Sequence, residues 1–176
     1  MNFRKAIESD IPAIAAIYDA IHTGEEKGET TIGWIRSVYP TADTARAALL
    51  RGDLFVQEDE NAIVGAAIIN QSQVDVYAGA PWRYPALDAQ VMVLHTLVIS
   101  PKCAGRGYGK QFVRFYESYA FSHGCRYLRM DTNARNTRAR TLYKKLGYRE
   151  ADIVPCVFNG ISGVNLVLLE KRLLPD

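Results

Sequence analysis

The stretch VMVLHTLVISPKCAGRGYGKQFVRFY, residues 91–116, predicts a strand, a glycine loop and a helix in direct succession. Its first residues are β-branched or apolar, as in a buried strand, and this strand ends before Pro101, which donates no ladder hydrogen bond. Gly105, Gly107 and Gly109 follow at alternate positions, and from Tyr108 onward apolar residues recur at helical spacing. Glycines bring backbone amides close to a ligand, and a helix N-terminus attracts anions. The stretch therefore predicts either a pyrophosphate cradle or a tight structural turn.

Two familiar phosphate-binding loops do not fit this glycine stretch. A P-loop needs Ser or Thr directly after its lysine, but Gln111 follows Lys110, and it needs a glycine where Ala104 stands. The dinucleotide-binding fingerprint needs a third small residue so that helix and strand pack closely, and Lys110 occupies that position. If the loop binds an anion, it belongs to another class of site.

Basic residues are concentrated in residues 101–149, which carry twelve Lys or Arg and only two acids, Glu117 and Asp131. The remaining residues include nine basic and seventeen acidic ones, so the net charge of +2 conceals a segment of +10. An anionic ligand is the natural partner of such a segment, although solvated basic helix faces would give the same pattern. Nucleic acid is disfavoured as a partner, because the basic residues are not interleaved with aromatics and no groove-reading motif occurs.

Regular elements are predicted along the rest of the chain. Apolar positions from Ile11 to Ile21 predict a helix capped by Ser9 or Asp10, and a second helical region, interrupted at Pro40, is expected over residues 30–52. The remaining expectations are strands at 2–6, 125–130, 153–159 and 164–171, a hairpin of 53–57 with 63–70, an irregular insertion at 72–88, and a helix within 136–148. A hairpin followed by helical crossovers predicts an α/β fold, a mixed sheet with helices on both faces.

Length and composition also limit the class of protein. A chain of 176 residues that is 48% apolar is most simply one domain over residues 1–176. Charged residues interrupt the first apolar positions, so neither a signal peptide nor a membrane span is predicted, and we expect a cytoplasmic protein with no membrane partner. The three cysteines, at wide spacing, suit reduced thiols better than disulfides or a zinc site, so no metal is expected.

Two motifs now carry a family resemblance. The segment LVISPKCAGRGYGKQFV, residues 97–113, resembles the coenzyme A signature of the GNAT superfamily of acetyltransferases, a strand ending in Pro and then R/Q-x-x-G-x-G/A opening a helix. Gly107 and Gly109 match this signature, whereas Ala104 stands where the family has Arg or Gln, so one side-chain phosphate contact is missing. The segment NTRARTLYKKLGY, residues 136–148, is similar to the family's N-x-x-A-x-x-L-Y-x-x-x-G-F/Y. It matches at Asn136, Ala139, Leu142, Tyr143, Gly147 and Tyr148.

The chain is therefore identified as a member of this superfamily with an unassigned acceptor. The motifs span residues 95–148, and the order of the elements fits over residues 1–172. The resemblance implies a mostly antiparallel central sheet of about six to seven strands, the GNAT acyl-CoA N-acyltransferase fold. It also implies acetyl-CoA as co-substrate, with main-chain groups of the strand on the pantetheine arm and loop amides on the pyrophosphate. The implied cofactor-binding residues are Leu97, Val98, Ile99, Gly105, Arg106, Gly107, Tyr108, Gly109, Lys110, Asn136 and Tyr143. Asn136 is also a candidate helix N-cap.

Acyl transfer to an alkylamine needs a base, since the pKa of a lysine-like amine is about 10. Asp131 ends its strand where several family members carry a carboxylate facing the acceptor, although it could instead pair with Arg129 or a turn amide. His95 shares a strand face with Leu97 and Ile99 if side chains alternate strictly, or it is a hydrogen-bonded core residue. We prefer Asp131 as the catalytic base, with His95 as the other candidate.

The leaving thiolate needs a proton, and the third candidate catalytic residue is Tyr143. The resemblance places it near the thioester sulfur, although a core tyrosine beside Leu142 and Leu146 would fit the helix equally. An amide near Val98 is expected to bind the oxyanion of the tetrahedral intermediate.

The expected function is an N-acetyltransferase that moves the acetyl group of acetyl-CoA directly to a primary amine of a small molecule or peptide. The alternative is a non-catalytic acetyl-CoA-binding sensor or interaction module on the same fold, and a homodimer is compatible with both. The acceptor side is expected near Trp34 to Tyr39, near Trp82 and Tyr84, and at residues 156–160. Residues 1–100 hold seven basic and thirteen acidic residues, which favours a cationic acceptor, although surface solvation explains this balance equally well.

Overall fold

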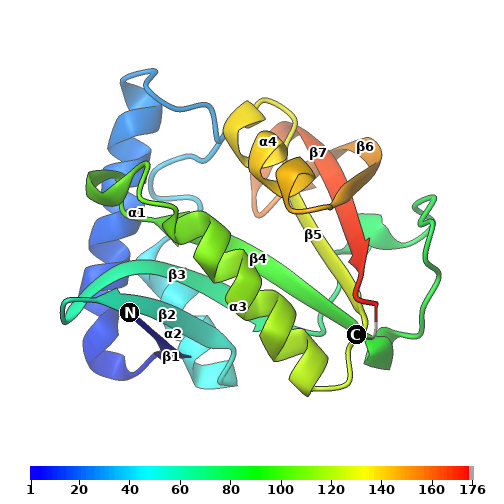
Figure 1. Cartoon of the computed structure of the whole chain (residues 1–176). Coiled ribbons are helices and arrows are strands. Elements are labelled where there is room, and N and C mark those ends of the chain that lie inside the picture. Colours follow the sequence, from blue (N-terminus) through cyan, green and yellow to red (C-terminus); the bar gives the residue numbers. More distant parts are fainter. Residues whose placement is uncertain (175–176) are drawn as a thin grey trace.

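The computed structural model describes residues 1–174, which form a seven-stranded sheet between two layers of helices (Figure 1). The strands are β1 (Asn2–Lys5), β2 (Leu54–Asp59), β3 (Ala62–Asn70), β4 (Val91–Ile99), β5 (Tyr127–Asn133), β6 (Arg149–Phe158) and β7 (Ile161–Arg172). The α-helices are α1 (Ile11–Glu26), α2 (Ala42–Arg51), α3 (Tyr108–Ser122) and α4 (Thr137–Lys145). The strand order is β1-β2-β3-β4-β5-β7-β6, and of these neighbours β4 and β5 are parallel while the others are antiparallel. The predicted mixed, mostly antiparallel sheet is confirmed.

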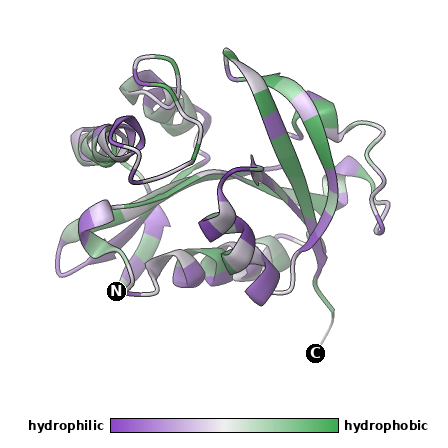
Figure 2. Cartoon of the chain, turned by 90° about the horizontal axis from the view of Figure 1, so that it is seen from above, coloured by the Kyte–Doolittle hydropathy of each residue, from purple (hydrophilic) through white to green (hydrophobic). Residues whose placement is uncertain are grey.

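The helices lie on opposite faces of the sheet, with hydrophobic strands between them (Figure 2). Helices α3 and α4 cover one face, where Phe112 and Tyr143 belong to the same buried cluster as Leu94 of β4. Helices α1 and α2 cover the other face, where Ile14 and Ala45 belong to a cluster with Val98. Each helix buries the apolar stripe that its sequence period predicts, and this burial is the main source of its stability.

The parallel pair β4 and β5 separates at its C-terminal end. Their pairing runs from Val91 with Tyr127 to Leu94 with Met130, but β4 continues to Ile99 and β5 to Asn133. Beyond Leu94 and Met130 the two strands diverge, while β5 stays paired with β7 as far as Asn133. The resulting gap in the ladder, called here the β4–β5 opening, leaves main-chain groups without a strand partner.

The expected helix over residues 30–40 is wrong. This segment forms an irregular loop with an isolated bridge between Ile35 and Tyr39, and the second helix is α2 alone. Gly33 has a φ of +82°, which a helix does not allow. Trp34 and Tyr39 pack against a buried cluster of the sheet, whereas Ile35 and Val38 are exposed. The insertion at residues 72–88 is irregular as predicted, with one short 3-10 turn at Asp75–Tyr77 and another at its end, Asp88–Gln90.

Helices of residues 1–174 are all too short or too polar to cross a membrane.

Candidate active site

The β4–β5 opening exposes main-chain groups of β4, the strand that the family resemblance places on the pantetheine arm. The amide of Ser100 donates to the carbonyl of Val64 at 2.8 Å, and Val98 pairs with Ala66 two residues along both strands. Hydrogen-bonding direction alternates along a strand, so the main chain of Val98 is directed to β3, and that of Leu97 and Ile99 toward the opening. Of the three expected strand contacts, Leu97 and Ile99 therefore have main-chain groups available to a ligand.

A β-bulge at Thr96 separates His95 from these two residues. The register between β3 and β4 shifts at this point, and Thr96 has a φ of +49°, which is rare for a β-branched residue. Leu97 and Ile99 pack against the cluster on the α3 and α4 face, whereas Val93, two residues before His95, belongs to a cluster on the other face. The expectation that His95 shares a face with Leu97 and Ile99 is therefore wrong, because the bulge breaks the alternation.

The glycine loop presents free amides at the start of α3. Gly105 and Gly107 have φ values of +82° and +80°, and a Cβ atom at either position would meet no atom within 4 Å. Within residues 1–174, five successive or nearly successive amides donate to no protein acceptor, those of Gly105, Gly107, Tyr108, Gly109 and Lys110. Free amides at a helix N-terminus, open on one side, are the geometry of an anion site.

Unpaired cations surround the same opening. Arg114, Arg140 and Arg149 of the basic segment are engaged by Glu117, Glu150 and Glu170. Nine cations of the segment form no ion pair within the described part of the chain. Arg126 and Arg129 lie over the rings of Phe121 and Trp82. The other seven lie in the glycine loop, at the start of α3 and around α4: Lys102, Arg106, Lys110, Arg135, Arg138, Lys144 and Lys145. Most of the segment's positive charge without an acidic partner therefore lies on the two elements that flank the β4–β5 opening.

Two expected site residues lie on or next to α4. The Asn136 side chain accepts a hydrogen bond from the amide of Ala139 at 3.1 Å, so it is the N-cap, and its carboxamide NH₂ group is left free. Tyr143 is buried on the α3 and α4 face, yet its hydroxyl has no hydrogen-bond partner in residues 1–174 and is not sealed from solvent. Burial, and secondly the charge of Asp131, raise the pKa of Tyr143. Its hydroxyl is therefore a free donor at neutral pH.

Asp131 lies on the other face of the sheet, just beyond Met130, the last residue of β5 that pairs with β4. Its Oδ2 accepts a hydrogen bond of 2.7 Å from the hydroxyl of the buried Tyr77. Burial raises the pKa of Asp131 to about 6, although the hydrogen bond from Tyr77 lowers it. The expected alternative partner, Arg129, instead lies over the Trp82 ring at 4.3 Å and donates to Gln73. The carboxylate is thus held by a neutral phenol, and it forms no ion pair with any cation of residues 1–174.

Asp131 lines a cleft of about 770 Å³ on the α1 and α2 face. His95 lines the same cleft, where its Nε2 lies 3.0 Å from Asn70 Oδ1 and burial lowers its pKa. Tyr39 also lines it and shares a hydrogen bond between its hydroxyl and that of Thr96, which ties the residue 30–40 loop to the bulge. Burial raises the pKa of Tyr39 to about 12. The cleft thus brings Asp131 and His95 together on one side of the opening.

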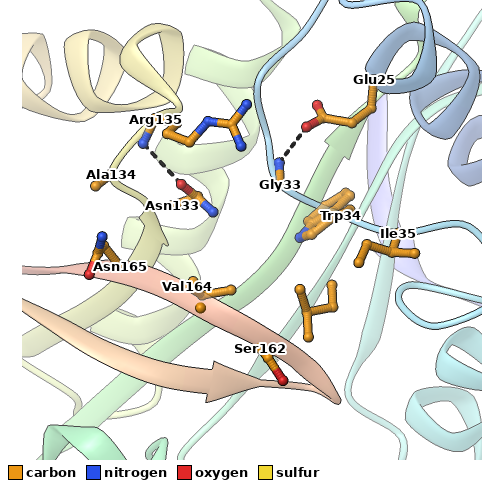
Figure 3. A pocket seen from close by; sticks show the side chains of 12 residues that line it. Glu25, Gly33, Trp34, Ile35, Asn133, Ala134, Arg135, Ser162, Val164 and Asn165 are labelled. Carbon is orange, nitrogen blue, oxygen red and sulfur yellow. Dashed lines mark hydrogen bonds between the residues drawn. The ribbon is translucent and has the colours of Figure 1, made fainter.

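A second pocket, of about 300 Å³, lies beside the first and is shown in Figure 3. Trp34 lines it, and Trp34, Tyr39 and Phe158 form edge-to-face contacts with centroid distances of 5.9 and 5.7 Å. Two of the expected acceptor-side segments, near Trp34 to Tyr39 and at residues 156–160, line these hollows. Trp82 and Tyr84 line neither, although Trp82 packs on Tyr77 at 5.4 Å and so supports the partner of Asp131.

Sequence reasoning missed three residues of this site. Tyr77 lies in an insertion without periodicity, and no local signal marked it as the partner of a carboxylate. Thr96 was part of a strong strand pattern that gave no sign of a bulge. Asn133 follows Asp131 at strand spacing, which could have identified it as a second polar residue on the same face. In residues 1–174 no three His, Cys, Asp or Glu side chains are grouped so as to hold a metal ion.

Sequence comparisons identify relatives of the chain. A family model described as the Acetyltransferase (GNAT) family matches residues 15–148. An uncharacterised N-acetyltransferase of Bacillus subtilis, YhfO, is 24% identical over 154 residues, which are 85% of this chain and 91% of the relative. An uncharacterised N-acetyltransferase of Methanocaldococcus jannaschii is 27% identical over 78 residues, which are 44% of this chain and 49% of the relative. The matched region covers about half the length of the Methanocaldococcus jannaschii relative.

Solved structures share the fold at low sequence identity. A GNAT-family acetyltransferase from Streptococcus agalactiae has a TM-score of 0.82 at 21% identity and covers 99% of this chain and 96% of its own. Salmonella typhimurium YncA, solved with its cofactor acetyl-CoA, has a TM-score of 0.71 at 17% identity and covers 100% of this chain and 95% of its own. These likenesses establish the fold alone, whereas the family match extends from α1 to the end of the second motif. The chain belongs to the acetyltransferase (GNAT) family.

Proposed function

We propose that this acetyltransferase moves the acetyl group of acetyl-CoA directly to a primary amine of a small molecule or peptide. One observation carries the proposal: Asp131 and Tyr143 flank the β4–β5 opening from opposite faces of the sheet. A base on one side and a proton donor on the other are what transfer to an amine requires, because the amine loses a proton and the thiolate gains one.

Acetyl-CoA fits the groups around the opening. The free amides of Gly105, Gly107, Tyr108, Gly109 and Lys110 suit the pyrophosphate, and the unpaired cations suit it and the further phosphate of the co-substrate. The main chain of Leu97 and Ile99 is available to the pantetheine amides, as is the free NH₂ group of Asn136. When bound, acetyl-CoA supplies the electrophilic thioester carbonyl. Ala104 offers no side-chain contact, so the loop amides carry the pyrophosphate binding.

Asp131 is the base in this proposal. With a pKa of about 6 it is ionised at neutral pH, yet it is a stronger base than an exposed carboxylate. It accepts the proton of the substrate ammonium, directly or through a water molecule in the cleft. His95 lines the same cleft and is the second candidate, and burial lowers its pKa from the ordinary histidine value.

Tyr143 completes the transfer. Its raised pKa keeps the hydroxyl protonated at neutral pH, and the absence of a partner within residues 1–174 leaves it free to donate to the departing thiolate. The amides of Leu97 and Ile99 are directed to the opening and are the donors available to the oxyanion. We further infer that residues 1–176 form one catalytic domain, located in the cytoplasm, where its free thiols at Cys103, Cys125 and Cys156 would remain reduced.

Amine-dependent release of thiol from acetyl-CoA tests this function. Polyamines, amino acids, aminoglycosides and peptide N-termini would be tried as acceptors, with acetyl-CoA binding followed in parallel by thermal shift. Binding together with thiol release that depends on an added amine supports the enzyme. Binding with no release for any acceptor identifies the acetyl-CoA sensor instead.

A further inference from the structure

The smaller pocket has a chemical character of its own. It is formed by the end of α1, the loop after it, the end of β5 and the start of β7, as Figure 3 shows. Asn133 of β5 lines it, two residues after Asp131, which lines the larger cleft. Residues two apart on a strand share a face and lie about 7 Å apart. The two backbone positions therefore lie within the span of one small molecule.

Hydrogen-bond donors without partners face this pocket. Asn133 Oδ1 accepts from the amide of Arg135 at 2.9 Å, which fixes the orientation of the carboxamide and leaves Nδ2 free. This Nδ2 lies so near the loop that a Cβ atom on Gly33 would be 2.3 Å away from it. The indole nitrogen of Trp34 and the guanidinium of Arg135 also have no acceptor within residues 1–174 (Figure 3).

The carboxylate in the pocket is already engaged. Glu25 accepts hydrogen bonds from the amides of Ile32 and Gly33, at 2.7 and 2.9 Å, and from the hydroxyl of Thr30 at 3.1 Å. It holds the loop in place, and Figure 3 shows its bond to Gly33. A ligand therefore meets these free N–H donors, of which Arg135 carries a positive charge, and the polar side chains of Ser162 and Asn165. Glu25 keeps its negative charge, but its oxygens already accept hydrogen bonds from the loop. This arrangement suits a carboxylate.

We propose that this pocket binds a carboxylate group of the acceptor, so that the substrate is an amino acid whose amine faces Asp131 and whose carboxylate meets Asn133, Trp34 and Arg135. The proposal rests on the proposed function, because it takes Asp131 as the site of the amine. The excess of acids in residues 1–100 does not oppose it, since an amino acid also carries a cationic amine and the donors belong to the pocket itself.

The test compares each common amino acid with its carboxamide and its decarboxylated amine. Turnover is measured as kcat/KM, and binding is measured by calorimetry in the presence of coenzyme A. At least one amino acid is expected to exceed both of its analogues by roughly 10- to 100-fold, as hydrogen bonds to a charged group imply. A preference for the decarboxylated amines or no preference, in turnover and in binding, overturns the proposal, as does the absence of binding by any amino acid.

Two variants place the preference in this pocket. Asn133→Asp keeps the shape and the acceptor for the Arg135 amide but replaces the free donor with a negative charge, and Arg135→Gln removes the cation from an exposed side chain. Each is expected to reduce the carboxylate preference about tenfold or more. Asn61→Asp, at the exposed β2–β3 turn, is the matched charge control and should leave the preference unchanged.

The two proposals fail in different ways. If amines are acetylated without a preference for a carboxylate, the proposed acetyltransferase activity is supported and the carboxylate site is refuted. If no amine is acetylated but amino acids bind and Asn133→Asp abolishes that binding, the carboxylate site stands and the catalytic proposal is refuted. Unchanged preference in both pocket variants refutes the site even where wild type prefers amino acids.

Discussion

Replacing Asp131 by asparagine should make the protein more stable and less active at neutral pH. Burial raises the pKa of this carboxyl from 3.8 to about 6. The ionised form is therefore disfavoured in the folded state, and folding stability falls as pH rises from about 3.8 to about 6. Asparagine keeps an oxygen for the Tyr77 hydroxyl but carries no charge, so the variant does not undergo this loss.

The size of the effect follows from the pKa shift. About two units at 1.36 kcal/mol each give roughly 3 kcal/mol as the upper limit. The cleft is open to solvent, so we expect about 1 to 2 kcal/mol above pH 7, or a rise in Tm of about 2 to 8 °C for a chain of this size. Well below pH 3.8 the variant and the wild type should be equally stable, because the carboxyl is then protonated in both the folded and the unfolded wild type.

Urea or thermal unfolding from acidic pH to pH 8, without acetyl-CoA, measures this difference. Asp75→Asn is the matched control, since it removes an exposed carboxylate from the same cleft and should change stability little at any pH. Turnover of Asp131→Asn should fall by roughly 10² to 10⁴, as for other general bases. An Asp131→Asn variant less stable than wild type at pH 8 would refute the reasoning, because the carboxylate would then be stabilised where it lies.

Three further substitutions test other parts of the site. Tyr143→Phe should lower turnover, because a donor to the leaving thiolate acts in the transition state, and calorimetry should show little change in acetyl-CoA affinity. If turnover is unchanged while the chemical step is rate-limiting, Tyr143 is a core residue. Tyr77→Phe removes the hydrogen bond that lowers the Asp131 pKa, so the acid limb of the kcat/KM profile should move to higher pH; an unmoved limb would exclude Asp131 as the titrating base. Gly107→Val should abolish the thermal stabilisation by acetyl-CoA, whereas the control Gly124→Val, with a similar φ of +76° at the other end of α3, should retain it. If acetyl-CoA raises the Tm of both variants equally, the loop is excluded as the phosphate site.

The Tyr77→Phe profile reports on several groups around the carboxylate. The charge of Asp131 raises the pKa values of Tyr39, Tyr77, Tyr143 and Cys156, after burial in each case. All four are neutral acids in the pH range where Asp131 titrates, so the acid limb is assigned to one of the two candidate bases, Asp131 or His95. His95→Gln separates these two, because it should leave the limb in place if Asp131 is the base.

The fold was predictable where local signals and packing agree. The strand at residues 91–99, the glycine loop and α3 each have a composition that suits one conformation, and the two motifs lie on elements that flank one opening. The free amides of the loop follow from the same signals, because alternate glycines disfavour continued regular structure. These features depend on residues that are neighbours in the sequence, so the sequence alone was enough to predict them.

The loop at residues 30–40 shows why the rest was not predictable. Ile32, Ile35 and Tyr39 have helical spacing, but their segment is fixed by contacts with distant strands, through Asn133 beside Gly33 and the hydroxyl of Thr96. The bulge at Thr96 is likewise stabilised by tertiary contact, since a threonine has no local preference for a positive φ. Long-range contacts of this kind also placed Tyr77 on Asp131, and no pattern in the chain encodes that pairing.

The most direct test of the central claim is a product balance with acetyl-CoA and an accepted amine. Free coenzyme A and N-acetylated amine would be quantified together, and the intact mass of the protein would be recorded after incubation with acetyl-CoA alone. Direct transfer from acetyl-CoA to the amine, at a site flanked by Asp131 and Tyr143, predicts equal amounts of the two products and an unmodified protein. Coenzyme A released without acetylated amine, or an acetylated protein that passes its acetyl group on to the amine, would contradict it.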